Sequence, residues 1–230
     1  MATTKKSDET RTRILEAALA LFRKRGFEET TMRNIAKEAG VALGAAYYYF
    51  DSKDALVMAF YGHAQDELGA LVEKTLPKSK GLEEQLRELV KMTIQYFAPN
   101  RELLRALSAH IDPQHPLSPF SEETREIREK DIRFFERLIR DSRVRVPEDL
   151  KTHLPRLLWL YQMGLILFWI YDRSPRQIKT QQLFEKTISI VVNLIKLSSF
   201  PLLRPIRRIA TNLLEIVYGD DGTLSPEASS

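Results

Sequence analysis

Apolar residues recur with the period of an α-helix along most of this chain. Between residues 8 and 25 they form one stripe with three- and four-residue spacings, made of Ile14, Ala17, Ala18, Leu21 and Phe22. Ser7 or Asp8 can cap the start of this helix, and Gly26 can adopt the left-handed conformation that ends it. A second, shorter stripe is closed by Gly40 and contains Met32, Ile35, Ala36 and Ala39.

The same period predicts further helices over residues 52–75, 81–97, 100–111, 120–143, 157–171, 177–197 and about 202–218. Proline-containing segments separate several of them, at 77–81 and in DPQHPLSP at 112–119. Pro147 suits the first turn of a helix, whereas Pro155 should kink or restart the helix that contains it. No segment alternates like a strand and no internal repeat is evident, so the sequence predicts an all-α fold.

The stretch GVALGAAYYYF, residues 40–50, fits neither a core helix nor a strand. A short helix, a tight turn at Gly40 and a second short helix form a helix-turn-helix, whose second helix enters the DNA major groove. Small residues let that helix approach the bases closely; they are Ala42, Gly44, Ala45 and Ala46. The tyrosines that follow can donate hydrogen bonds to phosphates. Phe50 is predicted to point inward as an anchor.

Composition narrows the remaining function classes. The 230 residues include 35 Lys and Arg against 31 Asp and Glu, a mild basic excess, and no cysteine. The absence of cysteine excludes disulfides, thiolate zinc sites and a cysteine nucleophile. His110, Asp112 and His115 are close in sequence, but their proline-rich loop makes surface chemistry the better interpretation than a metal site. No nucleophile elbow and no Gly-rich phosphate loop occurs, so we expect neither an enzyme nor a cofactor.

Two observations bear on location. The N-terminal stretch MATTKKSDETR lacks the apolar core of a signal peptide. The most apolar window, 157–171, is shorter than the ~20 residues needed to span a bilayer. We therefore expect a cytoplasmic protein with no membrane partner.

The stretch TTMRNIAKEAGVALGAAYYYFDSKDAL resembles the DNA-binding signature of TetR-type transcriptional regulators. The matching positions are Thr31, Ile35, Ala36, Ala39, Gly40, Val41, Gly44, Tyr47, Tyr48, Phe50, Lys53 and Leu56. The preceding helix, ILEAALALFRKRGFEETT, matches as well, so the resemblance covers roughly residues 10–57. The rest of the chain resembles the family only in being helical and of suitable length.

The resemblance implies which residues contact double-stranded DNA. Tyr48, Tyr49, Lys53 and Thr31 are expected at phosphates, and Arg33 at a base or a phosphate. The sequence departs from the family at Ala42, usually a capping Ser or Thr, at Leu43 and Ala45, usually polar, and at Tyr49, often His. Base reading should therefore depend on Arg33, Tyr47, contacts of Leu43 or Ala45 with thymine methyls, and DNA shape. A basic N-terminal arm can add backbone contacts and would gather positive charge at one end; it comprises Lys5, Lys6, Arg11 and Arg13.

The resemblance also implies a small-molecule cavity in the C-terminal part, and helical bundles build such sites between facing helices. For its lining we select Tyr96, His110, Trp159, Met163 and Phe168, although each alone could equally belong to a core or a dimer contact. Such a lining favours an apolar or aromatic ligand. Helices 157–171 and 177–197 should pack against their symmetry mates in a homodimer, through Leu165, Trp169, Ile188, Val192 and Ile195.

These expectations combine into one organisation. Residues 1–54 form an N-terminal three-helix DNA-binding domain, residues 55–218 a ligand-binding and dimerisation bundle, and residues 219–230 a disordered tail; helix 52–75 connects the two domains. The predicted function is a ligand-responsive, homodimeric transcriptional regulator, a repressor released from its palindromic operator by a small apolar or aromatic ligand. The alternative is a ligand-binding or scaffold protein of the same fold that no longer binds DNA, which has no need of Tyr48, Lys53 or the basic arm.

Overall fold

The computed structural model describes residues 2–76 and 80–218, and these form an all-helical structure without a strand. The predicted tail, 219–230, lies outside the described residues. The helices are α1 (Ala2–Arg25), α2 (Met32–Glu38), α3 (Leu43–Tyr49), α4 (Lys53–Thr75), α5 (Leu82–Phe97), α6 (Arg101–Leu107), α7 (Arg125–Asp141), α8 (Glu148–Lys151), α9 (Leu154–Tyr171), α10 (Ile178–Ser198) and α11 (Arg204–Tyr218). Short 3-10 turns precede α6, α10 and α11.

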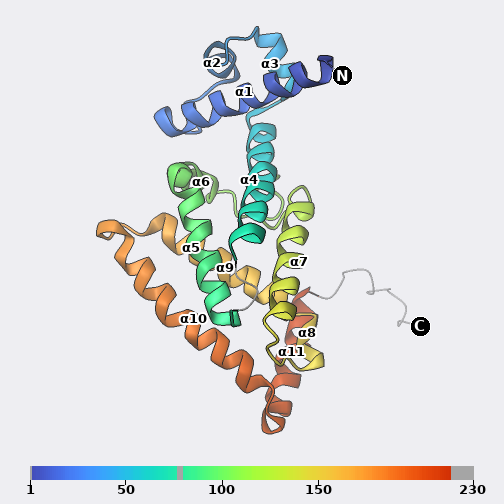
Figure 1. Ribbon diagram of the computed structural model, residues 1–230. Helices are drawn as coiled ribbons and strands as arrows, with labels where there is room; N and C mark the ends of the chain where they lie inside the picture. Colours follow the sequence, from blue (N-terminus) through green and yellow to red (C-terminus); the bar gives the residue numbers. More distant parts are fainter. Residues whose placement is uncertain (1, 77–79, 219–230) are drawn as a thin grey trace, which may run out of the picture.

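Helices α1, α2 and α3 form a head at one end of the molecule, above a body made of α5 to α10 (Figure 1). Its core contains the predicted stripe of α1, with Ile14 and Ala18 fully buried. The turn between α2 and α3 depends on Gly40, which adopts a left-handed conformation with φ of 64°. Phe50, directly after α3, is buried as predicted, with 3% of its surface exposed.

Helix α4 runs from the head into the body and is the element that connects the two (Figure 1). The Ser52 hydroxyl caps its start by accepting a hydrogen bond from the backbone N–H of Ala55. The head core continues past α4 into α6 and the loop after it, because Leu103, Leu107 and Leu117 belong to the same buried cluster. The head is therefore seated on the body by apolar contacts as well as by the chain.

The body has its own core, formed by α4, α5, α7, α9 and α10 around residues such as Leu86, Leu158 and Ile188. Asp172 fixes the joint between α9 and α10. Its carboxylate accepts hydrogen bonds from the backbone N–H groups of Ser174 and Thr180, both at 2.8 Å, and from both hydroxyls. One of these bonds satisfies the Thr180 N–H in the first turn of α10, and the two from Ser174 fix the chain just before it.

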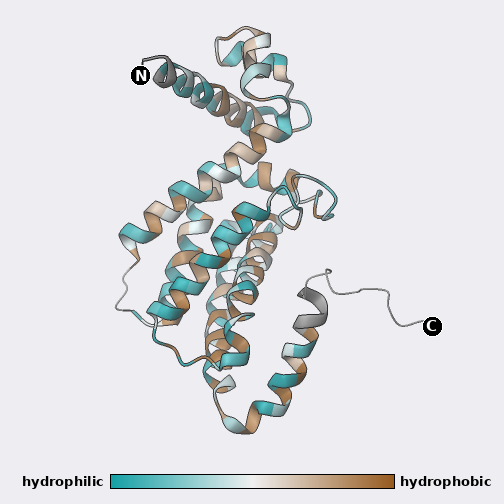
Figure 2. Ribbon diagram, turned by 90° about the vertical axis from the view of Figure 1, so that its right-hand side faces the viewer, coloured by the Kyte–Doolittle hydropathy of each residue, from teal (hydrophilic) through white to brown (hydrophobic). Residues whose placement is uncertain are grey.

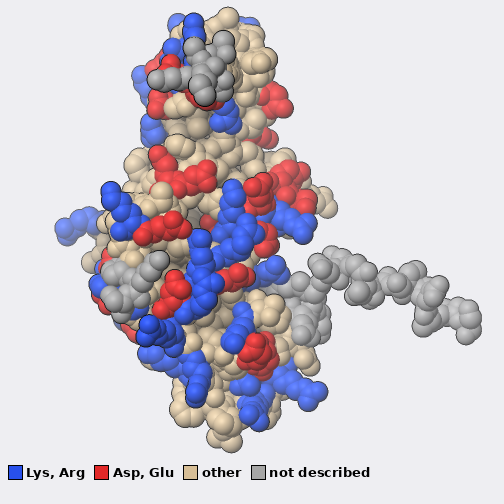
Figure 3. Space-filling model, turned by 45° about the vertical axis from the view of Figure 1, so that its right-hand side comes forward, with Lys and Arg blue, Asp and Glu red and all other residues tan. Residues whose placement is uncertain are grey.

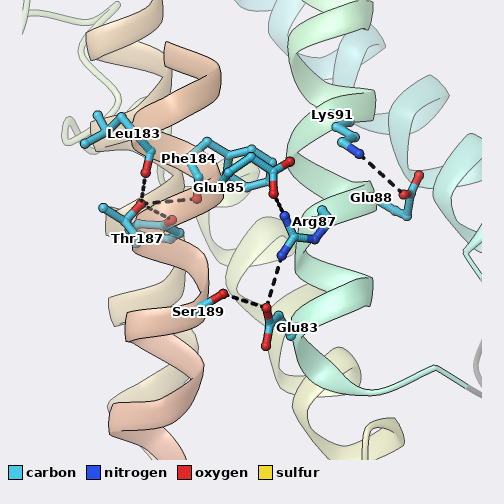
Figure 4. Close-up of polar contacts among 10 residues, drawn as sticks. Glu83, Arg87, Glu88, Lys91, Leu183, Phe184, Glu185, Thr187 and Ser189 are labelled. Atoms are coloured by element: carbon cyan, nitrogen blue, oxygen red, sulfur yellow. Dashed lines mark hydrogen bonds and ion pairs between the residues drawn. The ribbon is translucent and has the colours of Figure 1, made fainter. Parts of the chain in front are cut away.

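Polar contacts hold α10 against α5 on its outer side (Figure 4). Arg87 of α5 pairs with Glu83 one turn earlier, at 3.0 Å, and with Glu185 of α10. The Ser189 hydroxyl of α10 donates to the Glu83 carboxylate at 2.7 Å. These hydrogen bonds are charge-assisted and join α10 to α5 at Glu185 and Ser189.

Helix α11 turns away from α10 and stands apart from the bundle (Figure 2). The two helices meet at an angle of 95°. Arg207 fastens α11 by donating to the Asp149 carboxylate and to the Ser198 carbonyl, both at 2.6 Å. Apolar side chains of α11 remain exposed, among them Ile206, Ile209 and Leu213.

Three predicted helix limits were wrong. Residues 120–124 do not belong to α7, because Ser121 and Thr124 bury their hydroxyls in hydrogen bonds with the carbonyl of Ser118 and fold the chain into turns. The helix predicted over 100–111 ends at Leu107. The expected basic arm is helical, because α1 begins at Ala2 and no Gly or Pro interrupts residues 2–8.

The helix limit predicted at Pro155 agrees with the structure. Pro155 lies in the first turn of α9, so the helix restarts there as predicted. Helix α9 has the length and apolar composition of a membrane span. However, seven of its residues are buried within the body, which is typical of a core helix.

Candidate functional site

The head presents the second helix of the helix-turn-helix, α3, at its surface. Tyr48 is the most exposed aromatic residue there, with 82% of its surface accessible, and Tyr47 is 49% exposed. Ala46 on the opposite side is fully buried and lets α3 lie close to the head core. Gly44 faces open space, because a Cβ added to it would meet nothing within 4 Å.

The remaining residues expected in α3 differ in their freedom. Tyr49 is half-buried, and its hydroxyl accepts a hydrogen bond from the Ser7 hydroxyl at 3.3 Å. Ala42 is the N-cap of α3 and provides no side-chain hydrogen bond. Leu43 and Ala45 are half-buried. The exposed face of α3 therefore consists of Tyr47, Tyr48 and Gly44, with Ala42 at its start.

Thr31 and Arg33 lie at the start of α2. The Thr31 hydroxyl accepts a hydrogen bond from the Asn34 backbone N–H at 3.2 Å, and the Asn34 side chain accepts one from the Thr31 N–H. This reciprocal pair is a capping box, so Thr31 has a structural role besides the predicted phosphate contact. Arg33 is exposed beside it and makes no ion pair among the described residues.

Lys53 is held by the chain itself. Its ammonium group donates to the carbonyl of Phe27 at 2.8 Å and to that of Glu28 at 3.3 Å, and lies 4.4 Å from the centre of the Phe27 ring. It thereby ties the start of α4 to the turn between α1 and α2. The Arg11 guanidinium similarly lies over the Phe50 ring at 4.8 Å.

The positive charge of the protein is not confined to the head. On the face shown in Figure 3, Lys and Arg side chains are mixed with Asp and Glu over the body. Lys6 and Arg13 of the predicted basic arm are exposed on α1, and the side chain of Lys5 lies outside what the structure describes. The expectation that basic charge gathers at one end was therefore wrong for this face.

A cavity of about 410 Å³ lies inside the body, and we call it the inner cavity. Helices α4, α5, α6, α7 and α9 and the loop 108–124 form its walls. Of the five residues predicted to line it, the structure places three there: His110, Trp159 and Met163. Most of the remaining lining is apolar, including Leu68, Phe97 and Phe120.

Two of the predicted lining residues are elsewhere. Tyr96 points to the outside, where its hydroxyl donates to the Glu67 carboxylate at 2.7 Å, and its neighbour Phe97 lines the cavity instead. Phe168 is 41% exposed on the outer side of α9. For Phe168 the reason is that a helix such as α9, which is apolar on most of its circumference, does not reveal which side faces a cavity.

The loop 108–124 forms one wall of the cavity through residues such as Ile111, Leu117 and Phe120. Buried hydroxyls and Arg128 hold it in place. The Arg128 guanidinium donates to the carbonyls of Pro119 and Ser121, at 2.8 and 3.0 Å. His110 stacks on His115, with ring centres 3.9 Å apart, and within the described residues no group of three or more potential metal ligands occurs.

Sequence reasoning missed the polar residues of the inner cavity. Gln65 of α4 and Asp131 of α7 both line it. Their positions carry a signal: Asp131 lies four residues from Ile127 and four from Phe135, on the apolar side of its helix, and Gln65 follows Tyr61 by four. Burial raises the pKa of the Asp131 carboxyl to about 6, although hydrogen bonds from Gln65 and Trp159 oppose the shift.

The residues predicted at a dimer interface all belong to the core of a single chain. The exposed fraction does not exceed 7% for Leu165, Trp169, Ile188, Val192 and Ile195. A charge at Leu165 or Val192 would therefore disrupt the chain's own core. Three exposed apolar residues in the second half of α10 lie on its other side: Ile190, Leu194 and Leu197.

Comparison with known proteins accounts for most of the chain. Residues 14–60 match the family described as bacterial regulatory proteins, tetR family, and residues 85–213 match the tetracyclin repressor-like C-terminal domain. The transcriptional regulator TtgR of Pseudomonas putida is 33% identical over 129 residues, which cover 56% of this chain and 60% of TtgR. The chain thus matches less than two thirds of the length of this relative.

Solved structures share the fold. GusR of Salmonella enterica superposes with a TM-score of 0.61 and 21% identity, over 82% of this chain and 96% of GusR. FadR of Thermus thermophilus, a transcriptional repressor solved with lauroyl-CoA, superposes with a TM-score of 0.58 and 24% identity, over 77% of this chain and 92% of FadR. The helix-turn-helix spacing, the match over residues 85–213 and this common architecture agree. The chain belongs to the TetR family of bacterial regulatory proteins.

Proposed function

We propose that this protein is a homodimeric transcriptional regulator that binds double-stranded DNA through α3 and releases it when a small molecule occupies the inner cavity. The observation that carries the proposal is the surface of α3. Tyr47, Tyr48 and Gly44 are exposed together on a helix whose other side is buried, although an exposed tyrosine contributes little to the fold. Phenol hydroxyls that donate to phosphates and a glycine that lets the backbone approach the bases give this surface a use.

The proposed dimer uses the exposed side of α10. Ile190, Leu194 and Leu197 follow one another at four and three residues and form a continuous apolar stripe. Two such stripes related by a two-fold axis can bury each other in an isologous interface. The two heads would then enter successive major grooves of a palindromic operator, about 34–36 Å apart.

The ligand response is proposed to pass through α4. This helix lines the inner cavity with Tyr61, Gln65 and Leu68 and carries the head at its other end. A ligand that binds one position of α4 better than the other shifts the separation of the two heads. The mostly apolar lining suits an apolar or aromatic compound, and the FadR relative, a repressor, was solved with lauroyl-CoA. Repression and a cytoplasmic location belong to the same proposal.

The test is binding to the DNA upstream of the protein's own gene, measured at several salt concentrations. We expect affinity to fall steeply with salt, because phosphate contacts release counterions. Tyr48→Phe should weaken binding about threefold to tenfold on any sequence, the effect of one hydrogen bond. Tyr171→Phe is the matched control, since Tyr171 is 50% exposed in the body. Salt-independent binding that is equal for both variants would favour the scaffold alternative.

A further inference from the structure

Part of the polar lining of the inner cavity lies where this cavity adjoins a second hollow. Gln65, Leu68, Asp131 and Gln162 line both the inner cavity and a second hollow of about 550 Å³ between α4 and α7, which we call the outer groove. Asp131 therefore stands where the cavity adjoins the surface. A compound that inserts its apolar part into the cavity from the outer groove has its last atoms at this junction.

Asp131 has no counter-ion. None of the described Lys, Arg or His residues forms an ion pair with its carboxylate. Burial raises the pKa of this carboxyl to about 6, yet at neutral pH the ionised form still predominates. A mostly buried carboxylate is costly unless it is paired, so this position favours a cation.

Gln65 lacks a partner at the same place. Its amide nitrogen donates to the Ile127 carbonyl of α7 at 3.1 Å, while its Oε1 is buried and accepts no hydrogen bond from the described residues. Buried polar atoms without a partner are rare in proteins. Asp131 accepts hydrogen bonds from Gln65 and Trp159 but has no positive charge beside it, whereas Gln65 Oε1 has no donor at all.

The one guanidinium in the cavity lining does not supply it. Arg128 directs its Nη1 to the carbonyls of Pro119 and Ser121 and to the Thr124 hydroxyl, and so holds the loop 108–124. Its Nη1 is thus engaged with the chain, and no ion pair joins Arg128 to Asp131 among the described residues.

We propose that the effector is an amphiphilic cation, an apolar body with one protonated nitrogen, and that Asp131 and Gln65 receive its charged end at the junction of the inner cavity and the outer groove. This inference rests on the proposed function, in which the cavity binds the effector. An ammonium group offers three donors, enough for the Asp131 carboxylate and, once the amide turns, for Gln65 Oε1. Turning the amide breaks its bonds to the Ile127 carbonyl and to Asp131, both of which join α4 to α7, and the ammonium group replaces the donor that Asp131 loses.

The experiment compares three probes with the same tail, decylammonium, decan-1-ol and decanoate, by titration calorimetry below their micelle concentrations. We expect decylammonium to bind about tenfold tighter than the alcohol, and decanoate to bind weakest, because a close charge pair contributes at least this much when it is shielded from water. Asp131→Asn should remove the preference for decylammonium and leave the affinity for decan-1-ol unchanged. Asp131→Glu keeps the charge and should keep the preference.

Asp66→Asn is the matched control, because Asp66 lies next to Gln65 on α4 but lines only the outer groove. An equal loss in Asp66→Asn and Asp131→Asn would reduce the effect to general electrostatics and overturn the inference. Equal or tighter binding of decan-1-ol or decanoate, or binding of none of the three probes, would overturn it too. DNA release is measured in parallel. Release by decan-1-ol alone would overturn the inference about a cationic effector and support the proposed regulator. Selective binding of decylammonium without DNA release would support the cationic ligand and contradict the proposed regulation.

Discussion

Gly44 occupies its position for a reason outside the chain's own fold. Its φ is not left-handed and the space around it is open, so the conformation does not require glycine. Glycine inside a helix costs stability relative to alanine, by about 0.5–1 kcal/mol. A residue that weakens its own helix without a structural need is expected where another molecule approaches the backbone.

Gly44→Ala therefore separates folding from DNA binding. We expect the free energy of unfolding to rise by up to about 1 kcal/mol, because alanine is the better helix former. DNA affinity should fall about tenfold, since the new methyl group lies where the bases approach. Urea unfolding and DNA titration measure the two effects. A loss of stability, or unchanged affinity, would contradict the assigned role.

Ala42 gives a prediction of the opposite kind, because it occupies an N-cap without a capping side chain. Ala42→Ser should stabilise the protein by about 1 kcal/mol, the usual gain when a hydroxyl accepts a free N–H of the first turn. The midpoint of thermal unfolding without DNA measures it. Ala45→Ser, inside the same helix, is the control and should bring no gain.

At this scale the sequence predicted the head better than the cavity. Tyr48 and Phe50 are two residues apart, so a helical turn directs them to opposite sides. Tyr48 is exposed and Phe50 is buried. Asp131 was missed because a carboxylate on a helix is usually exposed to solvent. Its register with Ile127 and Phe135 would have placed it inward, and only the tertiary structure shows that no cation accompanies it.

Among the helices, the joint between α9 and α10 depends on one ionised carboxyl. Burial alone would raise the pKa of Asp172, but hydrogen bonds from Ser174 and Thr180 outweigh it and hold the pKa well below its usual range. A lowered pKa in the folded state stabilises the protein above the unfolded pKa of about 3.9. That contribution declines as the pH falls below about 4.

Asp172→Ala should therefore destabilise the protein at pH 7 by about 1–3 kcal/mol, because the N–H groups of Ser174 and Thr180 lose their acceptor. It should also flatten the dependence of stability on pH below about 4, since the titrating group is gone. Urea unfolding of both proteins at pH values from about 2.5 to about 7 measures both effects. Parallel pH curves would exclude this role of Asp172.

The periodicity of apolar residues predicted where the helices lie in the sequence, but not which side of each helix faces the core. In α10 apolar residues occur on both sides, at Ile188 and Val192 in the core and at Ile190 and Leu194 outside. The sequence contains no feature that distinguishes the two sides. The observed orientation buries Ile188 and Val192 and brings together Arg87 with Glu185 and Glu83 with Ser189, pairs that are far apart in the chain.

For the whole molecule, the exposed stripe of α10 predicts the assembly. Ile190→Glu with Leu194→Glu should give a folded monomer, because both residues are more than half exposed in the single chain, at 56% and 60%. Light scattering coupled to size exclusion measures the mass, and circular dichroism the helix content. Ile178→Glu, 48% exposed at the other end of α10, is the control and should remain dimeric. A dimer in all variants would place the interface elsewhere.

The head and the body share apolar contacts at Leu103, Leu107 and Leu117, while Lys53 binds the turn between α1 and α2 to the start of α4. The head is therefore attached both to the start of α4 and to α6 with the loop after it.

The loop 108–124 forms a wall of the inner cavity that is not part of the helical bundle. Helices that build a bundle are constrained by every neighbour, whereas a loop held by Arg128 and a few hydroxyls tolerates exchange of the side chains that it turns inward. Substitutions at Ile111 or Phe120 are expected to change which compounds fit the inner cavity while the exposed face of α3 stays as it is. The proposed ligand specificity can thus change without a change in the proposed DNA contacts.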